Sequence, residues 1–430
     1  MRYLQRVQHN SLKGTLETII LKFKQDSLFR NSVYLMLSTA VQAGLGFIFW
    51  IFAARLYTAE EVGIGTAMIA VSTLITNFSL FGFNSSFIRF LPNSKQKNET
   101  VNTGIVIVAL FSMVFTIIYL TGINIISPKL GFITDNPWTM VLFVIFTAID
   151  SINTLTDSVF IAYRSSVYNF IVYTAYSIIK LLAVVLLVGM GSYGVFFAYI
   201  GAIVVATTLS LYFMIRKFNY IPKINISKKI VNKMARYSFA NYLATFFAYL
   251  PSLLFPIMIL NFLGAKQSAQ YYLATMIANL LYVIPTATTL SLFAEGSHDN
   301  ESIARLVRQT IKTTAFIIIP ATIAIVVSGQ FILLIFGKEY STEATRLLQV
   351  LALISPLVAL TFVCNTVLKI KDHIKGVLVL NICFAIFTIT SAYILRAHLL
   401  GFGIALAIGY SVALILGTYF IHRYRLLEVQ

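Results

Sequence analysis

Charged side chains are scarce in this chain. Asp, Glu, Lys and Arg make up only 11% of its 430 residues, whereas an ordinary soluble domain carries about 25%. Hydrophobic residues make up 58%, and the mean hydropathy is +0.85. This balance excludes a soluble enzyme of the usual kind.

Residues that support catalysis or metal binding are also rare. Cys364 and Cys383 are the only cysteines and lie inside apolar runs, so we expect buried thiols without a disulfide framework. No Walker-type phosphate loop occurs, and the longest expected outer loop, residues 122–137, is too poor in polar groups for a glycan polymerase or acyltransferase. We therefore expect no enzyme activity, no cofactor and no metal. The five histidines lie in expected loops or tails without metal-ligand spacing: His9, His298, His373, His398 and His422.

The apolar residues form continuous runs of about 20 residues, and a helix of that length crosses the roughly 30 Å hydrocarbon core of a bilayer. Transmembrane β-strands would be shorter and alternating, which excludes an outer-membrane barrel. We therefore predict an all-α polytopic membrane protein with about twelve transmembrane helices. The expected spans are 31–54, 62–88, 101–121, 138–163, 168–188, 194–215, 237–260, 269–293, 313–336, 347–368, 376–395 and 401–421.

The distribution of basic residues predicts the orientation of these spans. With twelve spans and a cytoplasmic N-terminus, 25 of the 32 Lys and Arg residues lie on the cytoplasmic side and six on the outer side. The net charge of +17 then indicates anionic lipid as a neighbour rather than nucleic acid. We expect a multi-pass protein of the cell (cytoplasmic) membrane with both termini inside, and Trp50 and Trp138 as interfacial anchors.

The spans divide into two equal sets. The basic segment 216–236 separates residues 31–215 from residues 237–421, and an offset of 206 residues superposes the starts of the two sets. Because each set has an even number of spans, the repeats enter the membrane from the same side. We predict two parallel six-helix bundles around a central cleft. Residues 1–30 are expected to be an amphipathic cytoplasmic segment and 422–430 a cytoplasmic tail.

Helix breakers are unequally distributed between the two sets. No proline lies inside the first six spans, whereas the seventh contains both Pro251 and Pro256. At the equivalent depth the first span contains Gly44 and Gly46. Proline removes a helical hydrogen bond, so these four residues are candidates for bending gates, although static kinks are an equal alternative.

Three ionisable side chains fall inside spans, where they are costly and usually face a partner or a water-filled cavity. Asp150 and Asp157 share one face of the fourth span, and Lys180 lies at the depth of Asp150 in the fifth. We expect Asp150 and Lys180 to form an ion pair facing a polar cleft. Arg55 and Arg89, near the ends of the first two spans, either extend to the interface or bind a phosphate.

Local motifs in the first 90 residues resemble those of polysaccharide-biosynthesis flippases. These are O-antigen-type exporters of the multidrug/oligosaccharidyl-lipid/polysaccharide superfamily. The matching features are a helix-entry Asn-Ser, an Ala-Arg-x-Leu turn with an acidic pair and Gly-x-Gly, and an aromatic-basic end of the second span. They occur at Arg30-Asn31-Ser32, at residues 53–65 and at Phe87-Ile88-Arg89-Phe90-Leu91.

The resemblance implies a flippase that moves a polyprenyl-phosphate-linked oligosaccharide from the inner to the outer leaflet. Arg55, Arg89 and Lys180 are then candidate phosphate ligands. Asp150 and Asp157 would bind sugar hydroxyls or a coupling cation, either Na⁺ or H⁺. Membrane lipids, glycosyltransferases and a glycan polymerase are the expected partners, and a monomer is expected. The alternative is a cation-coupled multidrug or metabolite antiporter of the same fold, in which the two aspartates would serve cationic drugs.

Overall fold

The protein is described by a computed structural model that covers residues 27–297 and 303–426. Within these ranges the secondary structure is entirely helical, and twelve helices are long and apolar enough to span a membrane. The predicted fold class and span count are therefore confirmed. Of the expected N-terminal segment, residues 1–26 lie outside the described ranges, and the remainder belongs to the first described helix.

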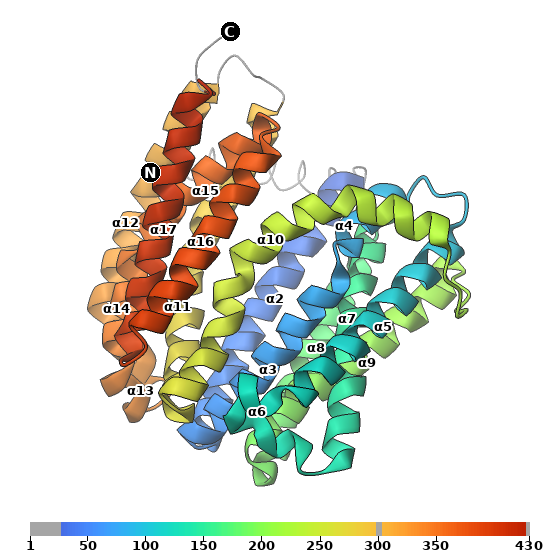
Figure 1. The fold of residues 1–430 in the computed structure, drawn as a ribbon, viewed down its shortest axis with the longest axis horizontal. Helices are drawn as coiled ribbons and strands as arrows, with labels where there is room; N and C mark the ends of the chain where they lie inside the picture. The colour runs from blue at the N-terminus through green and yellow to red at the C-terminus, as the bar shows by residue number, and fades with distance from the viewer. Residues whose placement is uncertain (1–26, 298–302, 427–430) are drawn as a thin grey trace, which may run out of the picture.

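In the described part of the first half, the chain forms eight α-helices and two short 3₁₀ helices. In chain order these are α2 (Ser27–Leu56), α3 (Ala59–Leu80), α4 (Phe83–Phe90), α5 (Lys97–Thr121), α6 (Ile123–Ile126), η1 (Pro128–Thr134), α7 (Pro137–Ala162), α8 (Val167–Leu186), η2 (Val188–Met190) and α9 (Ser192–Phe218). We call this set the first lobe. Figure 1 shows α2 to α9 gathered on one side of the molecule.

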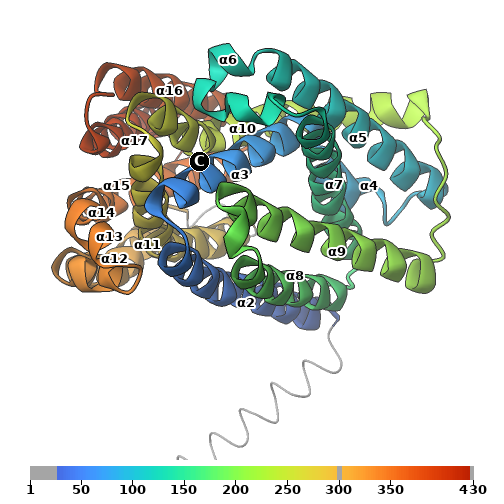
Figure 2. The same ribbon diagram turned by 90° about the horizontal axis from the view of Figure 1, so that it is seen from below.

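The second half forms eight α-helices. These are α10 (Lys228–Phe262), α11 (Ala265–Gly296), α12 (Ile303–Leu334), α13 (Lys338–Glu343), α14 (Thr345–Leu353), α15 (Ser355–Ile370), α16 (Ile374–Ile394) and α17 (Leu399–Arg423). We call α11 to α17, with the later part of α10, the second lobe. Seen along the bundle, α11 to α17 stand opposite α5 and α7 to α9, with α3 in the middle (Figure 2).

Two expected spans are broken. Span 62–88 was predicted as one helix, but Phe81 and Gly82 both adopt left-handed backbone conformations, with φ of 43° and 76°, so α3 ends and the short α4 follows. Span 347–368 is divided into α14 and α15 at Ile354, two residues before Pro356. Left-handed conformations and proline each interrupt the helical hydrogen-bond pattern, which explains both breaks.

The expected loop 216–236 is shorter than predicted, because α9 continues to Phe218 and α10 already begins at Lys228. The non-helical segment between them is held by Asn102 of α5. This side chain accepts hydrogen bonds from the Tyr220 hydroxyl (2.5 Å) and the Lys223 amide (3.1 Å), and donates to the Ile221 carbonyl (3.0 Å). The early part of α10 contacts the first lobe, where the Ser86 hydroxyl of α4 donates to the Met234 carbonyl at 3.3 Å. Farther along, the Ala244 carbonyl of α10 accepts from Asn381 of α16, and α10 also packs on α3 and α11.

The Ala-Arg part of the motif lies in the last turn of α2, and the acidic pair with Gly-x-Gly builds the start of α3. Thr58 and Glu61 form a capping box: the Glu61 amide donates to the Thr58 hydroxyl (3.2 Å) and the Thr58 amide donates to the Glu61 carboxylate (2.9 Å). Two residues later, a Cβ at Gly63 would overlap the backbone of Ala265 at the start of α11. This glycine therefore allows the two lobes to touch.

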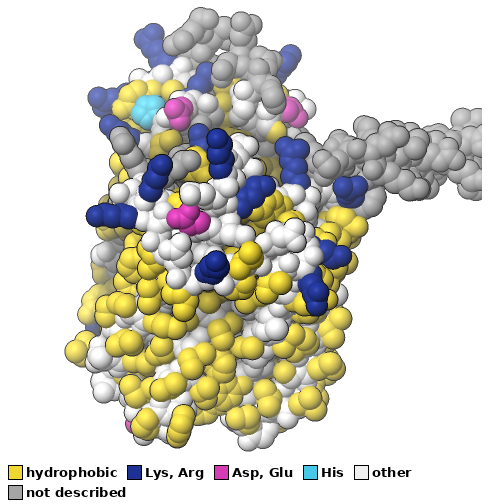
Figure 3. Space-filling view, turned by 90° about the vertical axis from the view of Figure 1, so that its right-hand side faces the viewer, with side chains coloured by type: hydrophobic (Ala, Val, Ile, Leu, Met, Phe, Trp, Pro, Cys, Tyr) yellow, Lys and Arg dark blue, Asp and Glu magenta, His cyan; other side chains and the backbone are white. Residues whose placement is uncertain are grey.

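The apolar cores show which ends of the lobes meet. One large core joins both lobes, from Phe49 and Val62 to Leu273 and Phe336. At the other end the cores are separate, one within the first lobe and two within the second. That other end, which we call the basic end, carries most of the Lys and Arg side chains (Figure 3). The lobes are thus packed together at the opposite end and separated at the basic end.

Candidate functional site

A cavity of about 880 Å³ lies between the lobes. Most of its wall comes from α10, α11, α15, α16 and α17 of the second lobe. The first lobe contributes residues of α3, together with Thr39 of α2 and Tyr199 of α9. A pocket of this size accommodates a ligand of drug or oligosaccharide-fragment dimensions.

Neutral hydrogen-bonding side chains dominate the polar part of this wall. Tyrosine, threonine and asparagine occur throughout, and Lys369 of α15 is the only charged residue among the described residues that line the cavity. The Nδ2 of Asn365 donates to Asn381 at 3.5 Å, and Asn381 donates to the Ala244 carbonyl at 2.9 Å. The carbonyl oxygen of the Asn365 side chain is buried and has no hydrogen-bond partner.

Sequence reasoning did not assign Lys369 or Asn365 to the site, although a signal was present. Thr361, Asn365 and Lys369 are spaced four residues apart, which places them on one face of α15. All three line the cavity. Each residue alone has a common structural explanation, because basic residues are frequent at the inner ends of spans and single amides often connect helices.

Of the expected gating residues, the prolines contact the cavity and the glycines do not. Pro251 and Pro256 are buried in its wall, and α10 remains helical through both. The Ser268 hydroxyl donates to the Pro256 carbonyl at 3.1 Å. A Cβ at Gly44 or Gly46 would meet no atom within 4 Å, so close packing does not require either glycine. Their gating role stays a prediction.

Arg55 does not reach the cavity. It lies at the end opposite the basic end, where Nε donates to the Ile335 carbonyl at 2.9 Å and a terminal nitrogen donates to the Leu334 carbonyl at 2.8 Å. These carbonyls end α12, where a cation is also favoured by the helix dipole. Neither the interface nor a phosphate is therefore its partner in this conformation; Arg55 joins the first lobe to the second.

Three further contacts hold the same end closed. Asn261 of α10 donates to the Ile126 carbonyl of α6 at 2.7 Å. The rings of Phe47 and Phe336 lie 5.1 Å apart. Trp50 was expected as an interfacial anchor but is only 5% exposed, because its ring lies 4.4 Å from that of Tyr272 in the other lobe.

The expected ion pair between Asp150 and Lys180 does not form, although both residues are described and buried. Asp150 accepts hydrogen bonds from Thr76 at 3.0 Å and Ser72 at 3.5 Å, both on α3. The Lys180 ammonium instead lies 4.8 Å from the centre of the Phe49 ring, and further aromatic rings of α8 and α9 surround it. The expectation assumed that the fourth and fifth spans pack against each other as an antiparallel pair, but α7 packs mainly on α5 and α9, whereas α8 packs on α2 and α9.

Asp157 is also buried in the first lobe. One of its carboxylate oxygens accepts a hydrogen bond from the Tyr173 hydroxyl, and the other has no partner. Neither aspartate nor Lys180 lines the central cavity, and Arg89 lies at the basic end of α4, exposed, with its guanidinium 5.8 Å from the Phe90 ring. The five charged candidates from the sequence are thus distributed around the cavity rather than gathered in its wall.

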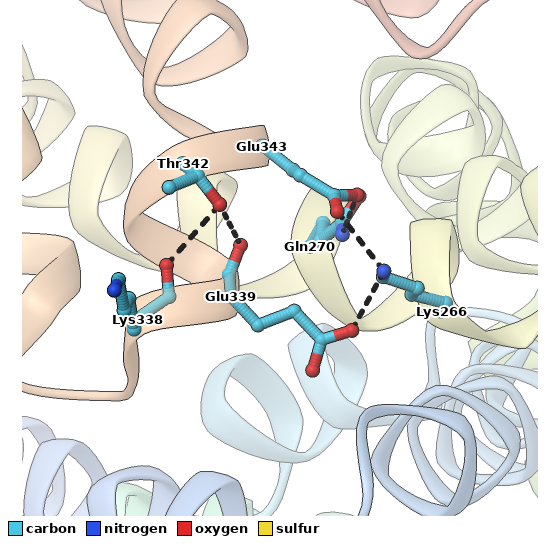
Figure 4. Close-up of polar contacts among 6 residues, drawn as sticks. All are labelled: Lys266, Gln270, Lys338, Glu339, Thr342 and Glu343. Carbon is cyan, nitrogen blue, oxygen red and sulfur yellow. Dashed lines mark hydrogen bonds and ion pairs between the residues drawn. The ribbon is translucent and has the colours of Figure 1, made fainter.

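A cluster of charged residues reinforces the second lobe at the end opposite the basic end (Figure 4). The Lys266 ammonium lies 2.7 Å from Glu339 and 2.9 Å from Glu343, and Gln270 donates to Glu343 at 2.8 Å. These contacts lower the pKa of Glu343 below its usual value. The cluster fixes α13 to the start of α11, which is the helix end that touches Gly63.

The described residues contain no group of three or more His, Cys, Asp or Glu side chains that could hold a metal ion. Cys364 is a buried free thiol, whereas the free thiol of Cys383 is only partly buried.

Comparison with known families gives two matches. The model described as polysaccharide biosynthesis protein matches residues 28–293, and the MatE model matches residues 242–394. A search of curated proteins gives no match.

Solved structures share the fold. An inward-facing multidrug resistance MATE family transporter of the MOP superfamily has a TM-score of 0.70 at 16% identity, covering 92% of this chain and 98% of its own. The lipid II flippase MurJ in an inward closed conformation has a TM-score of 0.72 at 13% identity, with coverages of 92% and 89%. A MOP superfamily transporter from Pyrococcus furiosus has a TM-score of 0.59 at 15% identity, with coverages of 93% and 95%. The two-repeat arrangement predicted from the sequence is therefore confirmed.

Proposed function

Since the chain belongs to the polysaccharide biosynthesis protein family, we propose that it flips a polyprenyl-phosphate-linked oligosaccharide across the cell membrane. The basic end is cytoplasmic in this proposal, as the positive-inside rule favours. The cavity then receives the glycan from the inner leaflet, and the prenyl chain stays in the lipid. Translocation follows when the lobes separate at the opposite end and close at the basic end.

The observation that carries the proposal is the chemistry of the cavity wall. Sugar hydroxyls need many neutral donors and acceptors, which the tyrosine, threonine and asparagine side chains supply. An anionic phosphate needs a cation at the mouth of the cavity, and Lys369, in the last turn of α15, supplies one. Arg89 and the basic segment after α9 add positive charge near the same end, which favours capture of an anionic lipid.

Asp150 and Asp157 take a different part in this proposal. They are 7% and 9% exposed and lie outside the cavity wall, so they are poorly placed as sugar ligands. Their burial next to hydroxyl groups suits a site for a coupling cation, Na⁺ or H⁺, within the first lobe. Cation binding there would change the packing of α7 on α3, through Ser72 and Thr76.

A cation-coupled drug antiporter remains the second candidate. The two buried carboxylates favour it, since such transporters couple drug export to cation entry. Against it stands the cavity, whose described lining contains no acidic side chain to attract a cationic drug.

Reconstituted protein tests the two candidates. Proteoliposomes would carry a fluorescent polyprenyl-pyrophosphate oligosaccharide, and a membrane-impermeant glycosidase would report the outer-leaflet fraction. We expect flipping by the wild type and a loss of at least tenfold in Lys369→Gln, whereas Lys371→Gln, outside the cavity lining, should behave as wild type. Cation-driven ethidium transport without any flipping of the glycolipid would support the antiporter and contradict our proposal.

A further inference from the structure

A second pocket, of about 470 Å³, lies within the second lobe. It is bounded by α12, α15 and α17, and we call it the side groove. Its wall is almost entirely apolar: Val307, Ile311, Leu360, Val363, Cys364, Leu414, Thr418 and Ile421, with His422 and Arg425 at one end.

The residues of α17 in the side groove follow helical spacing. Leu414, Thr418, Ile421, His422 and Arg425 form one stripe that ends just past the last turn of α17, at the basic end. The two basic side chains thus lie only at the end of the stripe that meets the headgroup region. From Leu414 to His422 the helix rises about 12 Å, whereas half of the roughly 30 Å hydrocarbon thickness is about 15 Å. The groove therefore extends through most of one leaflet.

The side groove is separate from the central cavity, although α15 forms part of both walls. Val363 and Cys364 face the groove, whereas Thr361 and Asn365 face the cavity. At Gly417 the two helices come so close that a Cβ would lie 2.7 Å from the Cβ of Cys364. The helices bounding the groove also present large apolar side chains to the exterior, among them Phe316 (82% exposed) and Ile415 (66% exposed). This is the environment of the bilayer.

We propose that the side groove binds one acyl chain of an anionic phospholipid, whose phosphate is held at His422 and Arg425. A groove that extends through most of one leaflet can hold much of the length of an acyl chain, and its wall is apolar like the chain itself. The cationic end matches a negative headgroup, because a guanidinium donates in pairs to phosphate oxygens. A bound chain packs against α15 on the side away from the cavity and so supports the helix that presents Lys369.

Native mass spectrometry of the intact chain in detergent tests this inference. The probes are phosphatidylglycerol and phosphatidylcholine with identical acyl chains, which separates the headgroup from the tail. Thr418→Trp fills the groove, and its matched control is Ile415→Trp, which adds the same bulk to the exterior of the same helix. A double variant, His422→Gln with Arg425→Gln, removes the cationic end.

Arg423→Gln is the matched control for charge, because Arg423 lies on the same turn but donates to Tyr419 and does not line the groove. We expect phosphatidylglycerol adducts to fall at least fivefold in Thr418→Trp and in the double variant, and to persist in both controls. Size-exclusion chromatography would show that each variant is folded.

Three results would overturn the inference. The first is unchanged phosphatidylglycerol retention in both the groove-filling and the double variant. The second is equal retention of phosphatidylcholine. The third is displacement of phosphatidylglycerol by polyprenyl phosphate at lower concentration, which would assign the groove to the tail of a transported lipid.

Discussion

Arg55 offers a direct test of how the lobes are held together. Its side chain donates two hydrogen bonds to the carbonyls of Leu334 and Ile335 that end α12, and these bonds cross from one lobe to the other. They exist only while the lobes meet at the end opposite the basic end. Arg55→Met removes both bonds and keeps the unbranched stem of the side chain.

The expected size of the effect follows from these contacts. A hydrogen bond to a charged group contributes about 1.5–3 kcal/mol, and solvent exposure of Arg55 places the two bonds together near the lower limit, about 1.5–2 kcal/mol. Because 1.4 kcal/mol is a factor of ten, Arg55→Met should raise the ratio of open to closed molecules at this end about 10- to 30-fold. Arg55→Lys should fall between, since an ammonium does not reproduce the planar fork of the guanidinium.

Double electron–electron resonance would measure the separation of the two lobes at this end through the distance between two spin labels. Spin labels at Ile125→Cys on α6 and Lys338→Cys on α13 lie on different lobes at the relevant end. The native thiols Cys364 and Cys383 would be replaced by alanine. Arg396→Gln is the control, because the described contacts of this arginine lie within its own lobe: the Phe262 and Tyr393 rings and the Tyr393 carbonyl, to which it donates.

An unchanged distance distribution in a folded Arg55→Met protein would refute the reasoning, because the closed state would then not depend on these bonds. An equal change in the Arg396→Gln control would refute it as well, since general loss of positive charge would be the cause.

Three other predictions follow from the site. Replacing Pro251 and Pro256 together by alanine restores two helical hydrogen bonds in α10. We expect this variant to be trapped in one state with the cavity intact, as measured by the accessibility of cysteines from the two sides of the membrane. Wild-type accessibility and transport would show that the prolines are static kinks. The effects of Asp150→Asn and Lys180→Met on thermal stability should add within about 0.5 kcal/mol, because the two side chains have separate partners. A coupling energy above about 1 kcal/mol in the double-mutant cycle would argue against the observed contacts. Because the pKa of Glu343 is lower in the folded state, this carboxylate stabilises the fold at pH values above its unfolded pKa of about 4.5. The stabilisation is lost as the pH falls through the folded-state pKa. Glu343→Gln should therefore flatten the acid side of a plot of melting temperature against pH, and identical plots for the two proteins would contradict this.

The sequence predicts the number of membrane spans better than it predicts which helices contact each other. Apolar runs and the basic bias determine the twelve spans, because hydrocarbon thickness and surface charge act on each span separately. Which helices touch depends on how side chains pack, and the expected contact between the helices of Asp150 and Lys180 was wrong for this reason. Trp50 failed for the same reason, since a partner ring in the other lobe covers it.

The candidate site was predicted only in part. The prolines of α10 were found because proline inside an apolar run is a local signal. Lys369 was missed because a cation at the end of a span has the same local pattern whether it faces lipid headgroups or a cavity. Only the packing of α15 beside α11 and α16, which also line the cavity, distinguishes the two.

Helix α10 belongs partly to each lobe. It begins against the first lobe and ends within the second, so its 35 residues connect the two lobes and are held at both ends (Figure 1). In the proposed transport cycle, rocking of the lobes would bend α10, and the stiffness of this helix would limit how far the lobes rotate. Proline removes the backbone donors that oppose bending, so Pro251 and Pro256 lower that stiffness locally. We therefore expect the number of prolines in α10 to influence how far the protein opens.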